Sequence, residues 1–193
     1  MSNDGMLSQM TDREVIKTLY LSQGLVILAG IAYYFIFFRD ASLFMSLWIF
    51  NWKNVILLGF GTSIVIVILE CIIDKMVPEA WYDDGGINKR MFKALSYPQI
   101  FVLMAVVAIA EECVFRGLIQ TQFGLTAASL FFALIHVRYI KKPLLLTTAI
   151  VLGFYLGCLF LITESLLVPI IAHYTIDVLL GIILKRQLKK QEG

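Results

Sequence analysis

Long apolar runs separated by short polar segments dominate the chain, and this pattern predicts its fold. A helix that crosses a lipid bilayer needs about 20 mostly apolar residues. Segments of this kind cover residues of about 19–38, 54–74, 98–119, 124–140, 143–162 and 166–184. Pro143 and Pro169 lie near the starts of the last two segments, where a missing backbone N–H costs a helix little. The pattern therefore predicts an all-α protein, a polytopic transmembrane helical bundle with about six spans.

A polar stretch divides the chain into two regions. Residues 77–97 form a polar loop that predicts a short amphipathic helix near its end. Residues 1–97 are expected to form an N-terminal region with two transmembrane helices and a cytoplasmic loop. Residues 98–193 are expected to form a four-helix core followed by a basic C-terminal tail.

Composition supports a membrane protein and excludes other classes. Of the 193 residues, 60% are hydrophobic and 16% are charged, and the mean hydropathy is +0.84. Soluble domains are about 45–50% apolar and about 25% charged, so membrane lipid is expected to cover much of this protein. A net charge of +2 is too small to indicate nucleic acid as a partner. Cys71, Cys113 and Cys158 lie in apolar runs and form neither a disulfide framework nor a zinc pattern.

The distribution of basic residues predicts the orientation of the bundle. With six spans, both termini and the second and fourth loops share one side of the membrane. Thirteen basic residues lie on that side: Arg13, Lys17, Lys75, Lys89, Arg90, Lys93, Arg138, Lys141, Lys142, Lys185, Arg186, Lys189 and Lys190. Arg39 and Lys53 lie on the other side, and Arg116 lies within a span. Because basic residues concentrate on the cytoplasmic side, we expect both termini in the cytoplasm. As a separate expectation, the protein is integral to the plasma membrane of a bacterium.

Residues 110–117, AEECVFRG, place charged side chains inside the third apolar segment. Each charge at this depth costs about 2.5–3.5 kcal/mol or more, so a partner or a function is expected to compensate it. Glu112 and Arg116 are four residues apart with the acid first, the favourable order for an ion pair on one helix face. Glu111 lies about 100° round the helix, without Arg116 as its partner. Such a carboxylate is suited to take a proton from water; the alternative is a charge cluster that only locks helices together.

The two histidines of the chain, His136 and His173, both lie in predicted spans. His173 and Asp177 are four residues apart, as are Phe132 and His136, so each pair is expected on one face of its helix. A lone buried histidine is commonly a hydrogen-bonded packing residue, but two of them beside a buried acid pair favour catalysis. For Phe132, plain packing is an equally good interpretation.

Three motifs now stand in order along the chain. They are EECVFR from Glu111 to Arg116, FALIH from Phe132 to His136, and HYTID from His173 to Asp177. In this order and on helices, they resemble the CAAX-protease and bacteriocin-processing family, also called the Abi family, which includes the type II CAAX prenyl endopeptidases. The resemblance covers about residues 98–184, and residues 1–97 carry no signature of the family.

The resemblance implies a four-helix catalytic core around a conical cavity. It also implies peptide-bond hydrolysis by a glutamate-activated water, without a covalent intermediate. By this pattern Glu111 is the base, helped by His136. Glu112 orients and neutralises Arg116.

The same resemblance places His173 at the water or oxyanion site, with Asp177 as its partner. Many members of the family have asparagine where this chain has Asp177, and an ionised aspartate cannot donate a hydrogen bond. Residue 177 is therefore expected to be protonated or to act through His173. No cofactor is expected; the alternative is zinc held by Glu111, His136 and His173, although the chain lacks an HExxH motif.

The expected partners are membrane lipid and a peptide or protein substrate, either prenylated or a peptide precursor, and the oligomeric state is left open. Two other functional classes use the same buried polar residues. One is a non-catalytic membrane protein that binds a partner, and the other is a small transporter or proton relay. Internal repeats would favour transport, and none is visible in the sequence.

The sequence places Glu111 and His136 at different depths in the membrane. Glu111 lies about 13 residues past Pro98, on the order of 20 Å along a helix. His136 precedes Arg138 by two residues and is expected near the cytoplasmic surface. For the two to meet, the third helix has to begin outside the membrane or the fourth has to extend past residue 140.

Overall fold

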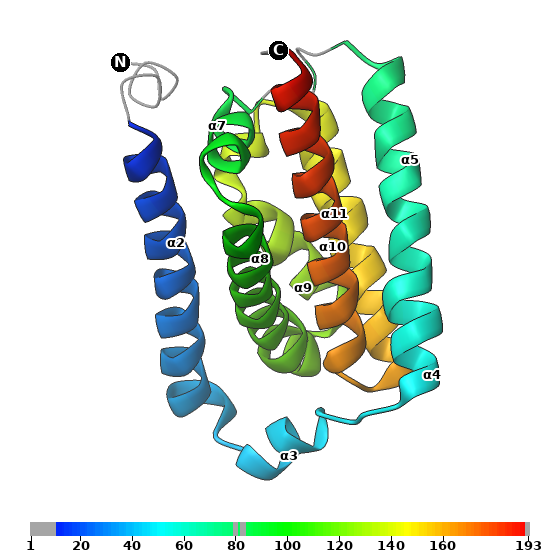
Figure 1. Ribbon diagram of the computed structural model, residues 1–193. Coiled ribbons are helices and arrows are strands. Elements are labelled where there is room, and N and C mark those ends of the chain that lie inside the picture. The colour runs from blue at the N-terminus through cyan, green and yellow to red at the C-terminus, as the bar shows by residue number, and fades with distance from the viewer. Residues whose placement is uncertain (1–10, 79–80, 82–83, 192–193) are drawn as a thin grey trace.

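A computed structural model describes residues 11–78, 81 and 84–191. Throughout this part of the chain the regular structure is helical, and it contains no strand. The predicted all-α bundle is therefore confirmed. Figure 1 shows the long helices side by side, with the start of the first described helix and the end of the last at the same end of the bundle.

The helices follow one another with short connections. In chain order they are α2 (Asp12–Tyr33), η1 (Tyr34–Phe38), α3 (Ala41–Ser46), α4 (Trp52–Asn54), η2 (Val55–Gly61), α5 (Thr62–Met76), α7 (Ile87–Ala94), α8 (Tyr97–Glu112), η3 (Cys113–Gln120), α9 (Thr121–Ile135), η4 (Val137–Tyr139), α10 (Pro143–Thr163) and α11 (Leu167–Gln191). Segments η1, η2 and η3 are π-helical, and each continues an α-helix. The short helix expected at the end of the polar loop is α7, so that prediction is confirmed.

Four helical segments are long and apolar enough to cross a membrane, and they mark an integral membrane protein. They are Asp12–Phe38, Trp52–Met76, Pro143–Thr163 and Leu167–Gln191. These are the first, second, fifth and sixth predicted spans. Their outer faces expose many large apolar side chains, which is what a surface covered by lipid requires.

The third and fourth predicted spans form one helical run that reverses direction at Gly124. This residue has a φ of +81°, which glycine adopts without strain. Beyond it α9 continues only to Ile135, about 11 residues or roughly 17 Å, against the ~30 Å of a bilayer core. One of the two arrangements expected to join Glu111 to His136 was a fourth helix that extends past residue 140. The structure does not have this arrangement, because α9 ends at Ile135.

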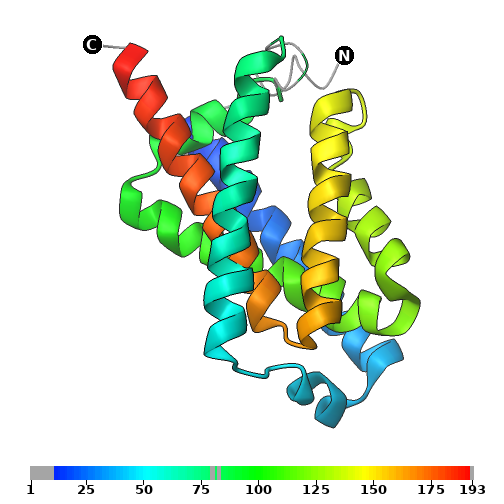
Figure 2. The ribbon, with the colours of Figure 1, turned by 90° about the vertical axis from the view of Figure 1, so that its right-hand side faces the viewer.

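Two other features bring the site residues to similar depths. The turn η4 connects α9 to α10, and Figure 2 shows α9 ending well below the top of α10. The same view shows α8 running obliquely across the bundle. The difference in depth between Pro98 and Glu111 is therefore smaller than the distance between them along the helix axis. A capping box between Ser96 and Gln99 fixes where α8 begins. His136 thus lies deeper, and Glu111 shallower, than straight parallel helices would place them.

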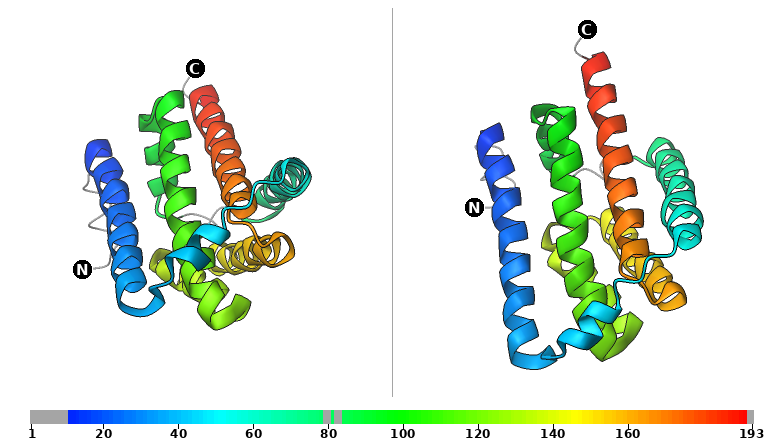
Figure 3. Two further views of the ribbon diagram at one scale, coloured as in Figure 1. Left: turned by 90° about the horizontal axis from the view of Figure 1, so that it is seen from below. Right: turned by 60° about the horizontal axis from the view of Figure 1, so that its bottom comes forward.

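Helices α8 and α11 occupy the middle of the bundle. Seen from below, α2 lies beside α8 and α5 lies beside α11 (Figure 3). One apolar cluster joins α2, α7, α8 and α11, and its buried members are Val15, Ile87, Met91, Phe92, Leu95, Ile100, Leu103, Met104, Val107 and Val178. The N-terminal region and the core region of the sequence therefore share one hydrophobic core.

Helices α9 and α10 pack closely at Gly153 and Gly157, two glycines four residues apart, a spacing that favours close approach of helices. A Cβ on Gly153 would lie 3.0 Å from the Ser129 carbonyl oxygen, and one on Gly157 would overlap Leu125. Two side chains from η3 donate hydrogen bonds to the carbonyl oxygens of these glycines. Arg116 donates to the Gly153 carbonyl at 3.2 Å, and Gln120 donates to the Gly157 carbonyl at 2.9 Å.

The start of α2 and the end of α11 lie on the same side of the bundle, as an even number of crossings requires (Figure 1). The turn between α9 and α10 and the helix α7 lie at that same end, whereas α3 and α4 lie at the opposite end. The predicted basic side and its sparsely charged counterpart thus fall at opposite ends of the molecule. The placement of the basic end in the cytoplasm stays a prediction.

Candidate active site

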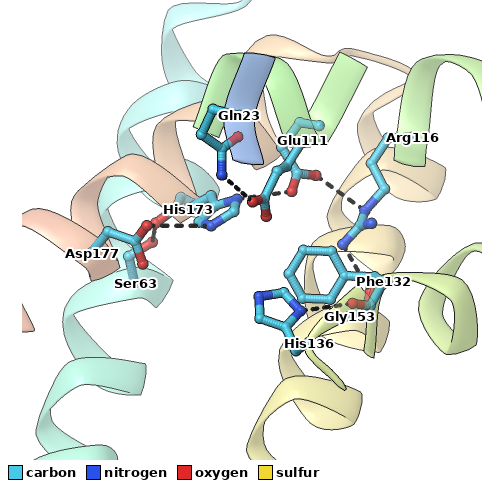
Figure 4. A network of polar contacts seen from close by, with 11 residues as sticks. Gln23, Ser63, Glu111, Arg116, Phe132, His136, Gly153, His173 and Asp177 are labelled. Atoms are coloured by element: carbon cyan, nitrogen blue, oxygen red, sulfur yellow. Dashed lines mark hydrogen bonds and ion pairs between the residues drawn. The ribbon is translucent and has the colours of Figure 1, made fainter. Parts of the chain in front are cut away.

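The predicted site residues come together at the meeting point of α8, η3, α9 and α11. Figure 4 shows the side chains of Glu111, Arg116, His136, His173 and Asp177 directed toward one region. Two helices of the N-terminal region also reach it, since α2 contributes Gln23 and α5 contributes Ser63. The site is therefore built from both regions of the sequence.

Glu112 and Arg116 form the buried ion pair that their spacing predicts. The Oε2 atom of Glu112 lies 3.0 Å from the Nε atom of Arg116, and both side chains are 0% exposed. Arg116 also donates to the carbonyl oxygen of Gly153, and its guanidinium lies 5.0 Å from the ring centroid of Phe132. The arginine is thus held by a carboxylate, a carbonyl and an aromatic face, and it ties η3 to α9 and α10.

His173 lies between two carboxylates. Its Nδ1 is 3.0 Å from Glu112 Oε1, and its Nε2 is 3.4 Å from Asp177 Oδ2. Ionised carboxylates only accept hydrogen bonds, so a doubly protonated imidazole satisfies both contacts and a neutral one satisfies a single contact. His173 and Asp177 share one helix face, as predicted. The sequence did not show the second partner, because Glu112 comes from another helix.

Glu111 is nearly buried, at 5% exposure, and has a partner that the sequence analysis missed. The Nε2 atom of Gln23 donates to its Oε1 at 3.0 Å. Within the part of the chain that the structure describes, no basic group lies at ion-pair distance from Glu111. The carboxylate is therefore held by a neutral amide, while its neighbour Glu112 takes the arginine and the histidine.

His136 is fixed by the carbonyl end of its own helix. Its Nδ1 lies 2.8 Å from the carbonyl oxygen of Phe132, and its ring stacks on Tyr139 at 5.3 Å. A carbonyl only accepts, so Nδ1 carries a proton and Nε2 of the neutral ring keeps a free lone pair. The Phe132 carbonyl is available because α9 ends here and its last carbonyls lack helical partners.

The ring of Phe132 contacts several residues of the site, so its role is larger than the plain packing that the sequence allowed. Its ring lies 5.1 Å from His136, 6.0 Å from His173 and 5.3 Å from Phe115, measured between ring centroids. It also forms the aromatic face beneath Arg116. Phe132 therefore separates the buried ion pair from His136 and forms an apolar wall between the two histidines.

Some of the expected residues are neighbours without a direct bond. In the described residues, His136 makes no hydrogen bond to Glu111 or His173. No three histidine, cysteine, aspartate or glutamate side chains in those ranges are arranged to hold a metal ion. The set of Glu111, His136 and His173 is thus not assembled as a zinc site here, and metal independence stays a prediction.

Three site residues lay outside the sequence motifs. Gln23 and Ser63 are polar residues in apolar spans, which is a weak signal that could have drawn attention to them. Ser63 donates to the Ala172 carbonyl at 3.2 Å, next to His173, and so joins α5 to α11. Gly153 takes part through its backbone carbonyl, and side-chain chemistry gives no sign of such a contact.

Known proteins share much of this sequence. Residues 93–179 match the family model described as type II CAAX prenyl endopeptidase Rce1-like. The chain is 38% identical over 157 residues to the protein of Bacillus subtilis (strain 168) named "Uncharacterized protein YpbD", covering 81% of this chain and 83% of that protein. The chain belongs to the Rce1-like family. No solved structure matches it.

Membership of the Rce1-like family confirms the resemblance drawn from the three motifs. The family match includes Glu111, Glu112, His136 and His173, so the buried network lies within the family's shared region. It begins at residue 93 and therefore leaves out α2, which supplies the amide that holds Glu111.

Proposed function

We propose that this protein is a membrane-embedded endopeptidase that hydrolyses a peptide bond with a water activated by Glu111. One observation carries the proposal. Glu111 is a buried carboxylate without a basic partner in the described chain, beside a second carboxylate that binds Arg116 and His173. A carboxylate that no ion pair occupies can accept a hydrogen bond and then a proton from a bound water.

The reaction needs only water as a co-reactant. The water oxygen attacks the carbonyl carbon of the substrate while one water proton passes to Glu111. The carbonyl oxygen gains the electron pair of the C=O bond and becomes an oxyanion. When the C–N bond breaks, the leaving nitrogen takes the proton from Glu111, and the products are a carboxylic acid and an amine.

The two histidines support different parts of this reaction. In its neutral form His136 has a proton on Nδ1, facing the Phe132 carbonyl, and its Nε2 can accept a hydrogen bond from the water. His173 donates toward Asp177 over the longer distance of 3.4 Å, and Asp177 is partly exposed. A substrate oxyanion that displaces Asp177 from this donor would be stabilised by it.

An apolar cavity of about 510 Å³ supports a substrate that carries a hydrocarbon group. It lies between α2, η1, α3, α8 and η3, and apolar and aromatic side chains line it, among them Ile27, Tyr34, Ile109, Ala110 and Cys113. Ala110 directly precedes Glu111 in the helix. We therefore propose a prenylated peptide as substrate, cleaved next to the modified residue, with no metal ion in the reaction.

Purified protein in detergent tests the proposal with two peptides of identical sequence, one farnesylated and one not. We expect cleavage of the farnesylated peptide, no loss of activity with a strong chelator, and no detectable cleavage by Glu111→Gln. The amide of that variant keeps the shape of the side chain but cannot take the proton. The control variant is Glu164→Gln, an exposed glutamate at the α10–α11 turn, which should match wild type.

Each alternative outcome has a definite meaning. Cleavage of the unmodified peptide at an equal rate would remove the role proposed for the apolar cavity. Loss of activity with chelator, restored by zinc, would overturn the metal-free reaction. Equal rates for Glu111→Gln and wild type would overturn the hydrolytic role of Glu111.

A further inference from the structure

We infer that Gln23 of α2 is a positioning residue for Glu111 and makes the N-terminal region part of the active site. The inference rests on the proposed function, since it concerns the same reaction. It goes beyond the family match, which begins at residue 93 and does not include α2.

The packing of α2 fixes the direction in which the Gln23 side chain points. The buried residues of this helix are Val15, Gln23 and Gly30, spaced by eight and seven positions along one face. Gly30 lets the helix approach η3 closely, because a Cβ there would lie 2.6 Å from Cγ2 of Val114. Val15 joins the apolar cluster at the other end. The helix is therefore held on both sides of Gln23, and the amide is directed at Glu111 (Figure 4).

The orientation of the amide follows from the chemistry of its partner. An ionised carboxylate only accepts hydrogen bonds, so the NH2 group of Gln23 faces Glu111 Oε1, at 3.0 Å. The carbonyl Oε1 of Gln23 is then left over, buried and without a partner among the described residues. A buried acceptor of this kind is costly unless a donor reaches it. The attacking water is a donor that the proposed reaction places beside Glu111.

A purely structural role does not explain this residue well. The remainder of the α2 face toward the bundle is filled by small and apolar residues, and an apolar side chain would pack here without an unpaired carbonyl. The charged groups near Glu111 are Glu112 on its own helix, Arg116 on η3, and His173 with Asp177 on α11. The last three are tied to Glu112 or to one another. Gln23 is thus the group that holds Glu111 in a defined rotamer.

The test compares Gln23→Met with wild type on the farnesylated peptide. Methionine keeps a similar length and volume but removes the N–H donor, so kcat should fall about tenfold, the worth of one charge-assisted hydrogen bond. KM should stay unchanged, because Gln23 acts on the base and not on substrate binding. Gln23→Asn, which keeps an amide on a shorter side chain, should recover part of the rate.

Two matched variants of α2 separate positioning from packing. Gly24→Ala adds a methyl group next to Gln23 where nothing lies within 4 Å, and it should leave kcat and the melting temperature unchanged. Gly30→Ala pushes on Val114 and should lower the melting temperature. A Gln23→Met protein with the wild-type kcat would overturn the inference. A loss of rate that follows melting temperature alone, as in Gly30→Ala, would also overturn it.

The failure of this inference can be told apart from the failure of the proposed function. If wild-type protein cleaves the peptide and Gln23→Met cleaves it equally well, only the inference is wrong. If wild-type protein cleaves nothing, the endopeptidase proposal is wrong, and the catalytic role of Gln23 is lost with it. A thermal double-mutant cycle between Gln23→Met and Glu111→Met then reports on the contact by itself, and additive shifts would show that even the contact is absent.

Discussion

The buried ion pair of Glu112 and Arg116 is the feature whose loss should cost the most stability. We expect Glu112→Gln to unfold at a much lower temperature than wild type. Both side chains are 0% exposed, and Glu112 also accepts from His173 at 3.0 Å. An amide offers one acceptor in place of two, and its NH2 group would face a donor of either Arg116 or His173. The guanidinium then stays buried without a counter-charge.

The magnitude follows from the burial of the pair. Removing one partner of a buried ion pair costs about 3–5 kcal/mol, because the other charge remains unpaired in the interior. For a chain of this length, 1 kcal/mol shifts the melting temperature by roughly 2–4 °C, so a decrease on the order of 10 °C is expected. In the variant, Arg116 still contacts the Gly153 carbonyl and the Phe132 ring. These contacts stabilise the guanidinium in part, so the loss of stability is expected at the lower end of the range.

Thermal unfolding in detergent, followed by tryptophan fluorescence, measures this decrease. The matched control is Glu111→Gln, the same chemical change one residue earlier. Gln23 can still donate to the new amide oxygen, so Glu111→Gln should melt within a few degrees of wild type. Adding Arg116→Met to Glu112→Gln should recover part of the loss, because the unpaired charge is gone. Equal melting temperatures for the two glutamine variants would refute the reasoning.

Four further predictions concern the two histidines, Asp177, the packing of α9 on α10 and the orientation of the chain. His136→Ala and His173→Ala should each lower kcat/KM about 10²-fold, the usual effect of losing a proton acceptor or an oxyanion donor, and a loss below threefold in either would remove that role. Asp177→Asn should retain activity, because asparagine still accepts from His173 Nε2; an inactive but folded variant would require the aspartate charge. Gly157→Ala should lower the melting temperature, since its Cβ would overlap Leu125 and lie 2.8 Å from Gln120 Oε1, whereas Gly24→Ala should not; equal melting would contradict the close packing of α9 and α10. A reporter that is active only outside the cytoplasm should give no signal when fused after Gly193, and a strong signal there would reverse the predicted orientation.

The sequence by itself determined the fold class and most of the site. In lipid, an apolar run of about 20 residues satisfies its backbone hydrogen bonds by forming a helix, so an all-α bundle followed from hydropathy alone. The pairing of Glu112 with Arg116 and the shared face of His173 and Asp177 also followed, because contacts at i and i+4 depend only on the geometry of one helix. The order of the three motifs was sufficient to indicate the family.

Tertiary structure alone decided how these pieces meet. The early end of α9 and the oblique course of α8 set the depths of His136 and Glu111, and neither is encoded in a local pattern. The contacts from Gln23 to Glu111 and from His173 to Glu112 join residues 88 and 61 positions apart. Periodicity predicts which face a side chain occupies on its own helix, but the partner across the interface depends on how ridges, glycines and tilts fit together. That fit assigned the arginine and the histidine to Glu112 and left Glu111 with a neutral amide.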